Sequence, residues 1–237
     1  MTVFALPVQP VFPDPVHADE DGLLAVGGDL SSHRLLMAYA QGIFPWYSEN
    51  SPILWWSPDP RLVLEPARIH VPKRLERILR QGRFRFTLDT VFEQVITGCA
   101  DTPRCGACGT WIVPEMLAAY CRLHELGFAH SIEVWSGETL VGGLYGVALG
   151  GAFFGESMFY REPDASKAGL VTLMRALEGA GFVLFDCQQT TPHMLRFGGF
   201  EVPRGEFLFR LEMALKLQTP CGPWSLRDGA LLGRGHE

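Results

Sequence analysis

The spacing of apolar residues divides the chain into two parts. The first 60 residues show weak periodicity, with one short helix predicted within 29–42, where capping residues precede an apolar face and a glycine follows it. Bulky aromatic residues lie between prolines over 44–58, more than a small core needs, so they are predicted to face the larger part. From about Arg61 the pattern becomes regular. We therefore expect a small N-terminal domain over 1–60 and a larger domain over 61–237.

The regular pattern predicts alternating helices and strands. The predicted strands are 62–64, 84–88, 130–135, 139–149, 152–160 and the segment around Asp186, and the predicted helices are 72–81, 90–99, 114–126 and 164–180, with further helix within 190–217. Short turns at 136–137 and 150–151 make three successive strands an antiparallel meander. This order indicates an α/β (α+β) fold, a mixed sheet layered with helices. The Gly-rich tail after Gly222 is expected to be loose.

Composition is that of a globular enzyme, with 237 residues, 47% hydrophobic and 19% charged. No apolar run approaches the roughly 20 residues that cross a bilayer, and the N-terminus lacks the basic start of a secretion signal. We expect a cytoplasmic monomer that does not bind membranes. The net charge of −6 argues against nonspecific coating of nucleic acid.

A basic segment reverses this charge locally. One acid, Glu76, accompanies six cations: Lys73, Arg74, Arg77, Arg80, Arg83 and Arg85. On a helix over 72–81, Lys73, Arg77 and Arg80 fall on one face. The stripe is either a solvated helix face or a surface for RNA.

Polar side chains end the apolar run that leads to Asp186 and Gln188. Alternate residues of a strand share a face, so these two side chains are predicted to project together from the strand end. One accepts protons and the other orients, which suits a reaction that removes a proton from a nucleophile. A polar strand end that caps a loop is the competing interpretation.

Motifs for metals, nucleotides and nucleophiles are weak. Cys105, Cys108, Cys121 and His124 have spacing similar to that of a zinc site, but the last two fall on a predicted helix whose register can serve the core. We predict free thiols and no metal. Ser157 lacks the second glycine of a nucleophile elbow, and the glycines of 142–146 match no nucleotide fingerprint. We predict no cofactor.

Seven segments together closely resemble the bacterial leucyl/phenylalanyl-tRNA–protein transferase family, in its order and spacing over roughly residues 12 to 212. They are GLLAVGGDL (22–30), GIFPW (42–46), LWWSP (54–58), GTWI (109–112), HSIEV (130–134), GESMF (155–159) and DCQ (186–188). The resemblance implies a small N-terminal lobe on an acetyltransferase-like domain. It also implies transfer of Leu or Phe, and less readily Met, from tRNA to proteins with N-terminal Arg or Lys, which marks them for degradation.

The resemblance also implies roles for individual residues. Asp186 and Gln188 are the implied catalytic pair, with Glu156 beside them, and the basic segment would meet the tRNA acceptor stem. The implied aminoacyl pocket comprises Trp46, Trp111, Tyr120, Leu144, Met158 and Leu173, for each of which core packing is the alternative. The chain departs from the family pattern at the Cys105 to Cys108 insert, at Leu173 and at Arg196, and the second departure leaves the pocket size open.

The chemistry is compatible with these residues. The donor ester is already activated, so transfer needs positioning, removal of one amine proton and oxyanion stabilisation, but no cofactor. Asp186 is expected to accept the late proton, and Asp186 and Glu156 to attract a basic acceptor. Two other functions remain open: an acetyl-coenzyme A dependent N-acetyltransferase, disfavoured by acids and a proline within 161–167 where that coenzyme needs glycines, and a noncatalytic RNA-binding module.

Overall fold

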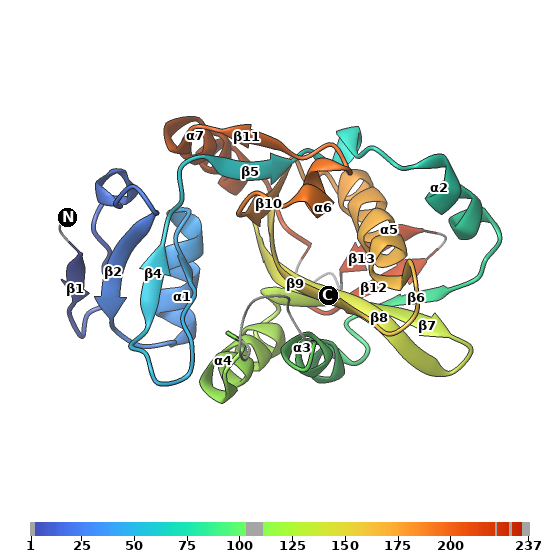
Figure 1. The fold of residues 1–237 in the computed structure, drawn as a ribbon, viewed down its shortest axis with the longest axis horizontal. Helices are drawn as coiled ribbons and strands as arrows, with labels where there is room; N and C mark the ends of the chain where they lie inside the picture. Colours follow the sequence, from blue (N-terminus) through green and yellow to red (C-terminus); the bar gives the residue numbers. More distant parts are fainter. Residues whose placement is uncertain (1–2, 103–110, 221, 228, 234–237) are drawn as a thin grey trace.

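A computed structural model describes residues 3–102, 111–220, 222–227 and 229–233, which form two main sheets and a hairpin (Figure 1). The smaller sheet has the order β1-β2-β4-β3, from Phe4–Leu6, Leu23–Gly27, Leu54–Trp56 and Phe44–Pro45. Helix α1 (Ser32–Ala40) begins where the Ser31 hydroxyl accepts the Arg34 N–H at 3.3 Å, and Gly42 follows it with a φ of 71°. The predicted helix within 29–42 is confirmed.

The larger sheet has seven strands in the order β11-β5-β10-β9-β8-β7-β6. Their bounds are Phe200–Val202, Arg61–Leu64, Leu184–Gln188, Ala152–Tyr160, Thr139–Leu149, Ala129–Ser136 and Arg85–Leu88. β7, β8 and β9 form the predicted antiparallel meander, whereas β10 pairs with β9 in parallel. The mixed sheet of the predicted fold class is therefore present, and the predicted boundary at residue 60 falls between the two sheets.

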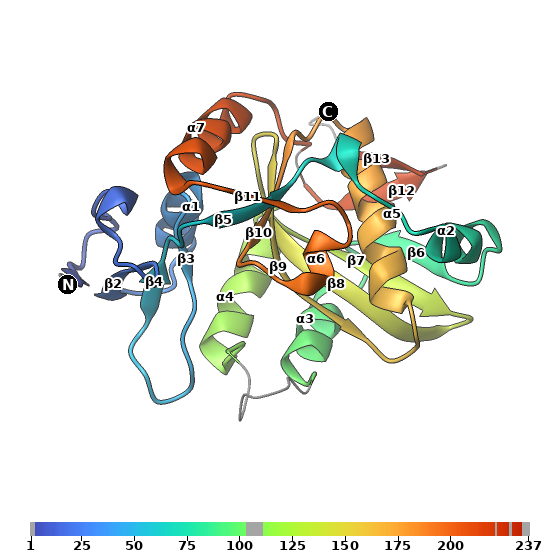
Figure 2. The same ribbon diagram turned by 45° about the horizontal axis from the view of Figure 1, so that its top comes forward.

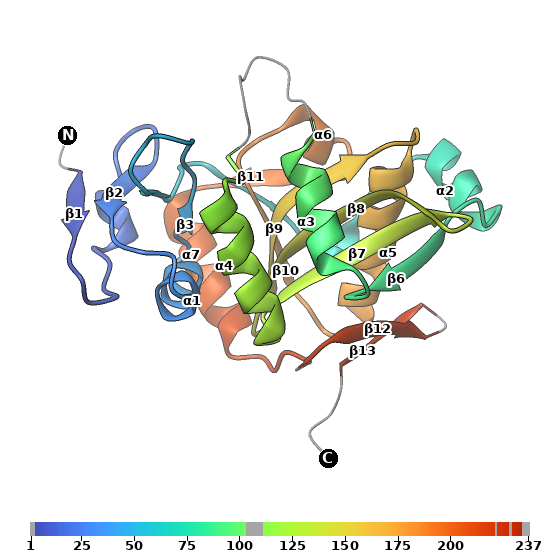
Figure 3. The same ribbon diagram turned by 90° about the horizontal axis from the view of Figure 1, so that it is seen from below.

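Helices cover both faces of the larger sheet. Figure 3 looks onto the face covered by α3 (Phe92–Ala100) and α4 (Pro114–Glu125), with α5 (Ala165–Gly179) behind the sheet. Side chains of β8 alternate between the two cores, Tyr145 toward α3 and α4 and Leu144 toward α5. The remaining helices are α2 (Lys73–Arg80), α6 (Pro192–Leu195), α7 (Arg204–Leu215) and the 3₁₀ turns Pro15–His17 and Pro66–Arg68. Figure 2 shows α7 beside β5 and α1, where it lies between the helix of the small lobe and the larger sheet.

Two predicted helix starts need correction. Helix α3 begins at Phe92 rather than at residue 90, because Asp89 has a φ of 55° and its carboxylate accepts the Ser131 N–H. Helix α5 begins at Ala165 rather than at residue 164, because Asp164 precedes it in the left-handed conformation, and the Asp164 side chain makes no capping hydrogen bond. It pairs with Lys167 and Arg74 instead.

The aromatic residues of 44–58 were predicted to face the larger domain, and this prediction is wrong for some of them. Trp55 is fully buried within the small lobe, where its ring meets Phe12 and its Nε1–H donates to the carbonyl of Gly27. Phe44 does face the larger domain, because its ring lies against the Arg61 guanidinium. Within the described residues, no helix has the length and apolar character needed to span a membrane.

The described part of the tail after Gly222 is folded, so the prediction of a loose end is wrong for residues 223–227 and 229–233. Strands β12 (Trp224–Arg227) and β13 (Ala230–Gly233) form a hairpin beside β6 and α5 (Figure 3). Trp224 is buried, and its ring stacks on His130 with centroids 3.6 Å apart. Its backbone N–H donates to Asp89 at 2.6 Å. One large aromatic side chain thus anchors a segment that has little periodicity of its own.

Truncation of Trp224 tests this anchor. Trp224→Ala is expected to lower the free energy of unfolding by about 3–5 kcal/mol, because it empties a buried aromatic site. Leu232→Ala, at an exposed position of the same hairpin, is expected to change it by no more than about 0.5 kcal/mol. Urea unfolding measures both, and equal effects from the two substitutions would contradict the anchoring role.

Candidate functional site

Asp186 lies inside the sheet and forms an ion pair with Arg61 of the neighbouring strand β5. Arg61 Nε donates to Asp186 Oδ1 at 2.9 Å and Arg61 Nη2 to Oδ2 at 2.7 Å, and both side chains are buried. The guanidinium lies between the rings of Phe44 and Phe207, at 4.8 and 4.5 Å from their centroids. Both carboxylate oxygens are therefore engaged, and the charge of Asp186 is already balanced.

A bulge separates Asp186 from Gln188. Along β10, Asp186 is opposite Val63 and Gln188 is opposite Leu62, so two steps on one strand match one on the other. Gln188 has a φ of 63°, and its backbone N–H donates to Asp186 Oδ1 at 2.8 Å. The prediction that both side chains project together from the strand end is wrong, because Asp186 remains buried and the chain turns at Gln188.

Glu156 of β9 is where the site residues meet. Its Oε1 accepts Gln188 Nε2–H at 2.8 Å and the Tyr39 hydroxyl at 2.7 Å, and its Oε2 accepts the Tyr120 hydroxyl at 3.1 Å. Burial raises the pKa of Glu156 to about 7, and the charge of Asp186 adds to this rise, while the three hydrogen bonds oppose it. A carboxyl group with this pKa can both take and give a proton near neutrality.

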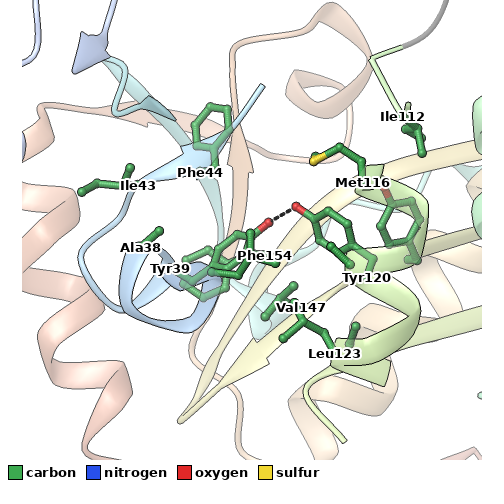
Figure 4. Packing of buried hydrophobic residues seen from close by; sticks show 14 of the residues in the cluster. Ala38, Tyr39, Ile43, Phe44, Ile112, Met116, Tyr120, Leu123, Val147 and Phe154 are labelled. Atoms are coloured by element: carbon green, nitrogen blue, oxygen red, sulfur yellow. Dashed lines mark hydrogen bonds between the residues drawn. The ribbon is translucent and has the colours of Figure 1, made fainter. Parts of the chain in front are cut away.

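The two tyrosines come from different parts of the chain. Figure 4 shows Tyr39 of α1 and Tyr120 of α4 pointing toward one another, with their hydroxyl groups in hydrogen-bond contact. Each hydroxyl has one hydrogen, so while Tyr39 donates to Glu156, Tyr120 donates either to Tyr39 or to Glu156. Burial, followed by the charge of Glu156, raises the pKa of each tyrosine well above its usual value, so both keep their protons. Sequence reasoning missed Tyr39, which showed only as part of an apolar helix face, and Arg61, which showed only as the residue before a strand.

A cavity of about 380 Å³ adjoins Glu156. Its walls are largely apolar and include Leu144, Tyr145, Met158, Phe185 and Met194. Of the predicted pocket residues, Leu144 and Met158 line this cavity, Tyr120 reaches the site through Glu156, and Leu173 is buried in the same core as Leu144. Trp46 and Trp111 do not line it, and Trp46 packs against Trp56 with ring centroids 5.7 Å apart. The cavity can hold an apolar side chain next to a titrating carboxyl group.

Two further side chains that can titrate, those of Cys187 and His193, line the cavity. Burial, and then the charge of Asp186, raises the pKa of the Cys187 thiol well above its usual value, so this thiol stays protonated. Burial lowers the pKa of His193, and the charges of Lys167 and Arg196 lower it further, which favours the neutral ring. A protonated thiol is a poor nucleophile.

The basic segment predicted to meet tRNA lies on α2 and on the residues that lead from it into β6. Its cations, Lys73, Arg74, Arg77, Arg80, Arg83 and Arg85, are all exposed, on α2 and the segment up to β6. Arg74 pairs with Asp164, Arg80 with Glu76 and Arg83 with Glu162, at 3.4, 3.3 and 2.9 Å. In the described part of the chain, Lys73 and Arg77 make no ion pair. Arg85 makes no ion pair there either, and its guanidinium lies over the Trp135 ring at 5.0 Å from the centroid. The predicted helix is confirmed, and its Lys73 and Arg77 are available to an anionic partner.

Two of the four residues with zinc-like spacing, Cys121 and His124, lie within the described residues. Cys105 and Cys108 lie outside the described residues. His124 Nδ1 lies 2.8 Å from the carbonyl of Ala129, to which it donates, and its ring stacks on Phe92. Cys121 is half-buried with a free thiol. Among the residues that the structure describes, no three metal-binding side chains gather.

Comparison with known proteins gives a consistent result. Residues 63–212 match the family model described as leucyl/phenylalanyl-tRNA protein transferase, and residues 28–59 match the model of that family's N-terminal domain. A leucyl/phenylalanyl-tRNA–protein transferase of Anaeromyxobacter dehalogenans is 59% identical over 226 residues, 95% of this chain and 97% of that protein. One of Oleidesulfovibrio alaskensis is 58% identical over 234 residues, 97% of this chain and 94% of its own length.

Solved structures give a weaker likeness. A GCN5-related N-acetyltransferase from Kribbella flavida is similar over 76% of this chain and 63% of its own, with 13% identity and a TM-score of 0.40.

The titration of Glu156 tests the geometry of the site. Carboxyl ¹³C NMR of glutamate-labelled protein, assigned with Glu156→Gln, is expected to give a midpoint at pH about 7 for Glu156. Tyr39→Phe removes a donor that stabilises the charged form, so it raises the pKa of Glu156 further. Glu133, whose pKa burial also raises to about 7, is the internal control and does not move. An unchanged Glu156 midpoint in Tyr39→Phe would contradict the hydrogen bond.

Proposed function

Because the chain belongs to the leucyl/phenylalanyl-tRNA protein transferase family, we propose that it moves Leu, Phe and, less readily, Met from aminoacyl-tRNA to proteins that begin with Arg or Lys. The modified proteins are thereby marked for degradation through the N-end rule, and the enzyme works as a cytoplasmic monomer without a cofactor. The observation that carries this proposal is the largely apolar cavity beside Glu156, because a hydrophobic aminoacyl group fits there with its ester next to a proton acceptor.

The reaction is an aminolysis of the aminoacyl ester. The α-amino nitrogen of the acceptor attacks the ester carbonyl carbon, a C–N bond forms and the C–O bond to the ribose breaks. The nitrogen becomes cationic and gives one proton to the Glu156 carboxylate, which returns a proton to the departing ribose oxygen. Gln188, through its hydrogen bond to Glu156, holds this carboxylate in place. Asp186 does not take the proton in this scheme, since both of its oxygens are engaged.

Selection of the aminoacyl group follows from the cavity walls. Apolar walls reject charged side chains, because these would lose their hydration without gaining a partner. They separate Leu, Phe and Met by only about 1–3 kcal/mol, the value of small differences in apolar contact. Overlapping use of the three amino acids is the consequence.

Selection of the acceptor follows from charge. An acceptor that begins with Arg or Lys brings two positive charges, on the α-amino group and on the side chain. Arg61 balances Asp186, so Glu156 is the carboxylate at the site that remains to attract them. Of the two carboxylates expected to attract the acceptor, Asp186 and Glu156, we therefore assign this role to Glu156.

Acetyl transfer from acetyl-coenzyme A is the alternative function. That coenzyme would place its pyrophosphate at the N-terminus of a helix such as α5. Here Glu162 and Asp164 occupy this turn and pair with Arg83, Arg74 and Lys167. Two carboxylates where a pyrophosphate should bind disfavour the alternative.

A transfer assay tests the proposal. Radiolabelled Leu-tRNA is mixed with a peptide that begins with Arg or with the same peptide beginning with Gly. The Arg peptide is expected to be labelled about 10- to 100-fold faster, since a hydrogen bond to a charged group contributes about 1.5–3 kcal/mol. Label that stays on the tRNA, or acetylation when acetyl-coenzyme A replaces the tRNA, would contradict the proposal.

The basic segment gives a separate test of tRNA binding. Replacing Lys73, Arg77 and Arg80 together by Gln is expected to weaken binding of all tRNAs alike and to reduce the slope of log K against log salt by roughly 2–3. Lys216→Gln with Arg227→Gln, two exposed cations elsewhere, should leave the slope unchanged. If the slope of the triple variant equals that of the wild type, α2 is not part of the tRNA surface.

A further inference from the structure

Among the described residues, Arg61 donates to both carboxylate oxygens of Asp186. Its side chain is almost fully buried, and its guanidinium contacts the rings of Phe44 of the small lobe and Phe207 of α7. Two of its nitrogens donate to Asp186, at 2.9 and 2.7 Å, and its Nη1 is buried without a hydrogen bond. The guanidinium is thus fixed in its plane and in its direction.

The contacts continue from Arg61 to the reacting group. Asp186 Oδ1, held by Arg61 Nε, accepts the backbone N–H of Gln188 at 2.8 Å, and this bond spans the bulge where Gln188 adopts a φ of 63°. The left-handed conformation is unfavourable for a residue other than glycine, so it needs support from its surroundings. The side chain of Gln188 then donates to Glu156. Each contact sets the position of the next.

We propose that Arg61 is a positioning residue for aminoacyl transfer, which acts through Asp186 and Gln188 on the carboxylate of Glu156. This inference rests on the proposed function. Asp186 is, in this arrangement, a fixed anion that holds the Gln188 backbone, and the proton moves on Glu156 alone.

An arginine suits this task better than a lysine. The planar guanidinium makes two parallel hydrogen bonds to a carboxylate and stacks on aromatic rings, whereas an ammonium is a point charge that leaves the carboxylate free to rotate. A purely structural reason for the pair is weaker, because apolar residues often replace buried ion pairs without loss of stability. The pair is located where β10 departs from regular pairing, next to Gln188.

Steady-state transfer from Leu-tRNA to an Arg peptide tests the inference. Arg61→Gln is expected to lower kcat by about 100-fold, the effect of a small misplacement at a reacting group, while KM for Leu-tRNA changes by less than about 3-fold. Arg61→Lys, which keeps the charge but not the fork, is expected to restore part of kcat. If Arg61 acts through Gln188, the double variant Arg61→Gln/Gln188→Ala is no more than about 3-fold slower than Gln188→Ala alone.

Arg34→Gln is the matched control. Arg34 is as deeply buried, donates to the carbonyls of Pro7 and Val8, and pairs with Asp29 at 3.3 Å within the small lobe. At a temperature where circular dichroism shows each variant folded, its kcat should stay within about 3-fold of the wild type.

Three results would overturn the inference: a folded Arg61→Gln with the kcat of the wild type, a loss that falls on KM instead of kcat, or losses from Arg61→Gln and Gln188→Ala that multiply. If Arg61→Gln does not fold, Arg61→Lys decides, and wild-type kcat in that variant overturns the inference. If the wild-type protein itself transfers no label, the proposed function fails. If it transfers label and the Arg61 variants match it, only the positioning role fails.

Discussion

The buried ion pair between Arg61 and Asp186 is the constraint on which the site depends. A buried carboxylate without a partner costs several kcal/mol, so the ion pair with Arg61 offsets the burial of Asp186 inside the sheet. Arg61 in turn lies between an aromatic ring of the small lobe and one of α7. The pair therefore connects the packing of both lobes with the bulge at Gln188, and through it with Glu156.

The second element of the site is a hydrogen-bond network that crosses between the lobes. Tyr39 comes from the helix of the small lobe, Tyr120 from α4 and Glu156 from the large sheet. Their convergence places a carboxyl group with a pKa of about 7 beside an apolar cavity. The protonated thiol of Cys187 lies at the same cavity, and its raised pKa favours direct transfer over an enzyme-bound thioester.

Local pattern was enough to predict most of the sheet and its helices. The meander, α2 and α4 follow from periodicity, and the helix of the small lobe follows from its caps. The prediction of a loose tail was wrong because Trp224 is held by His130 and Asp89, which are distant in sequence. The prediction that the side chains of Asp186 and Gln188 share a face was wrong, because a bulge residue changes the alternation of side chains between the two faces of a strand. Arg61 and Tyr39 carried no local signal, since their importance comes from partners more than 100 residues away.

The central claim is that Glu156 carries the proton of the reaction while Arg61 keeps Asp186 out of it. The most direct test is the single-turnover rate of leucyl transfer to an Arg peptide as a function of pH, in the wild type and in Tyr39→Phe. The account predicts a limb near pH 7 in the wild type that moves to higher pH in the variant, because loss of the Tyr39 hydroxyl raises the pKa of Glu156. A limb at the same pH in both proteins would report the acceptor amine instead and would contradict the account.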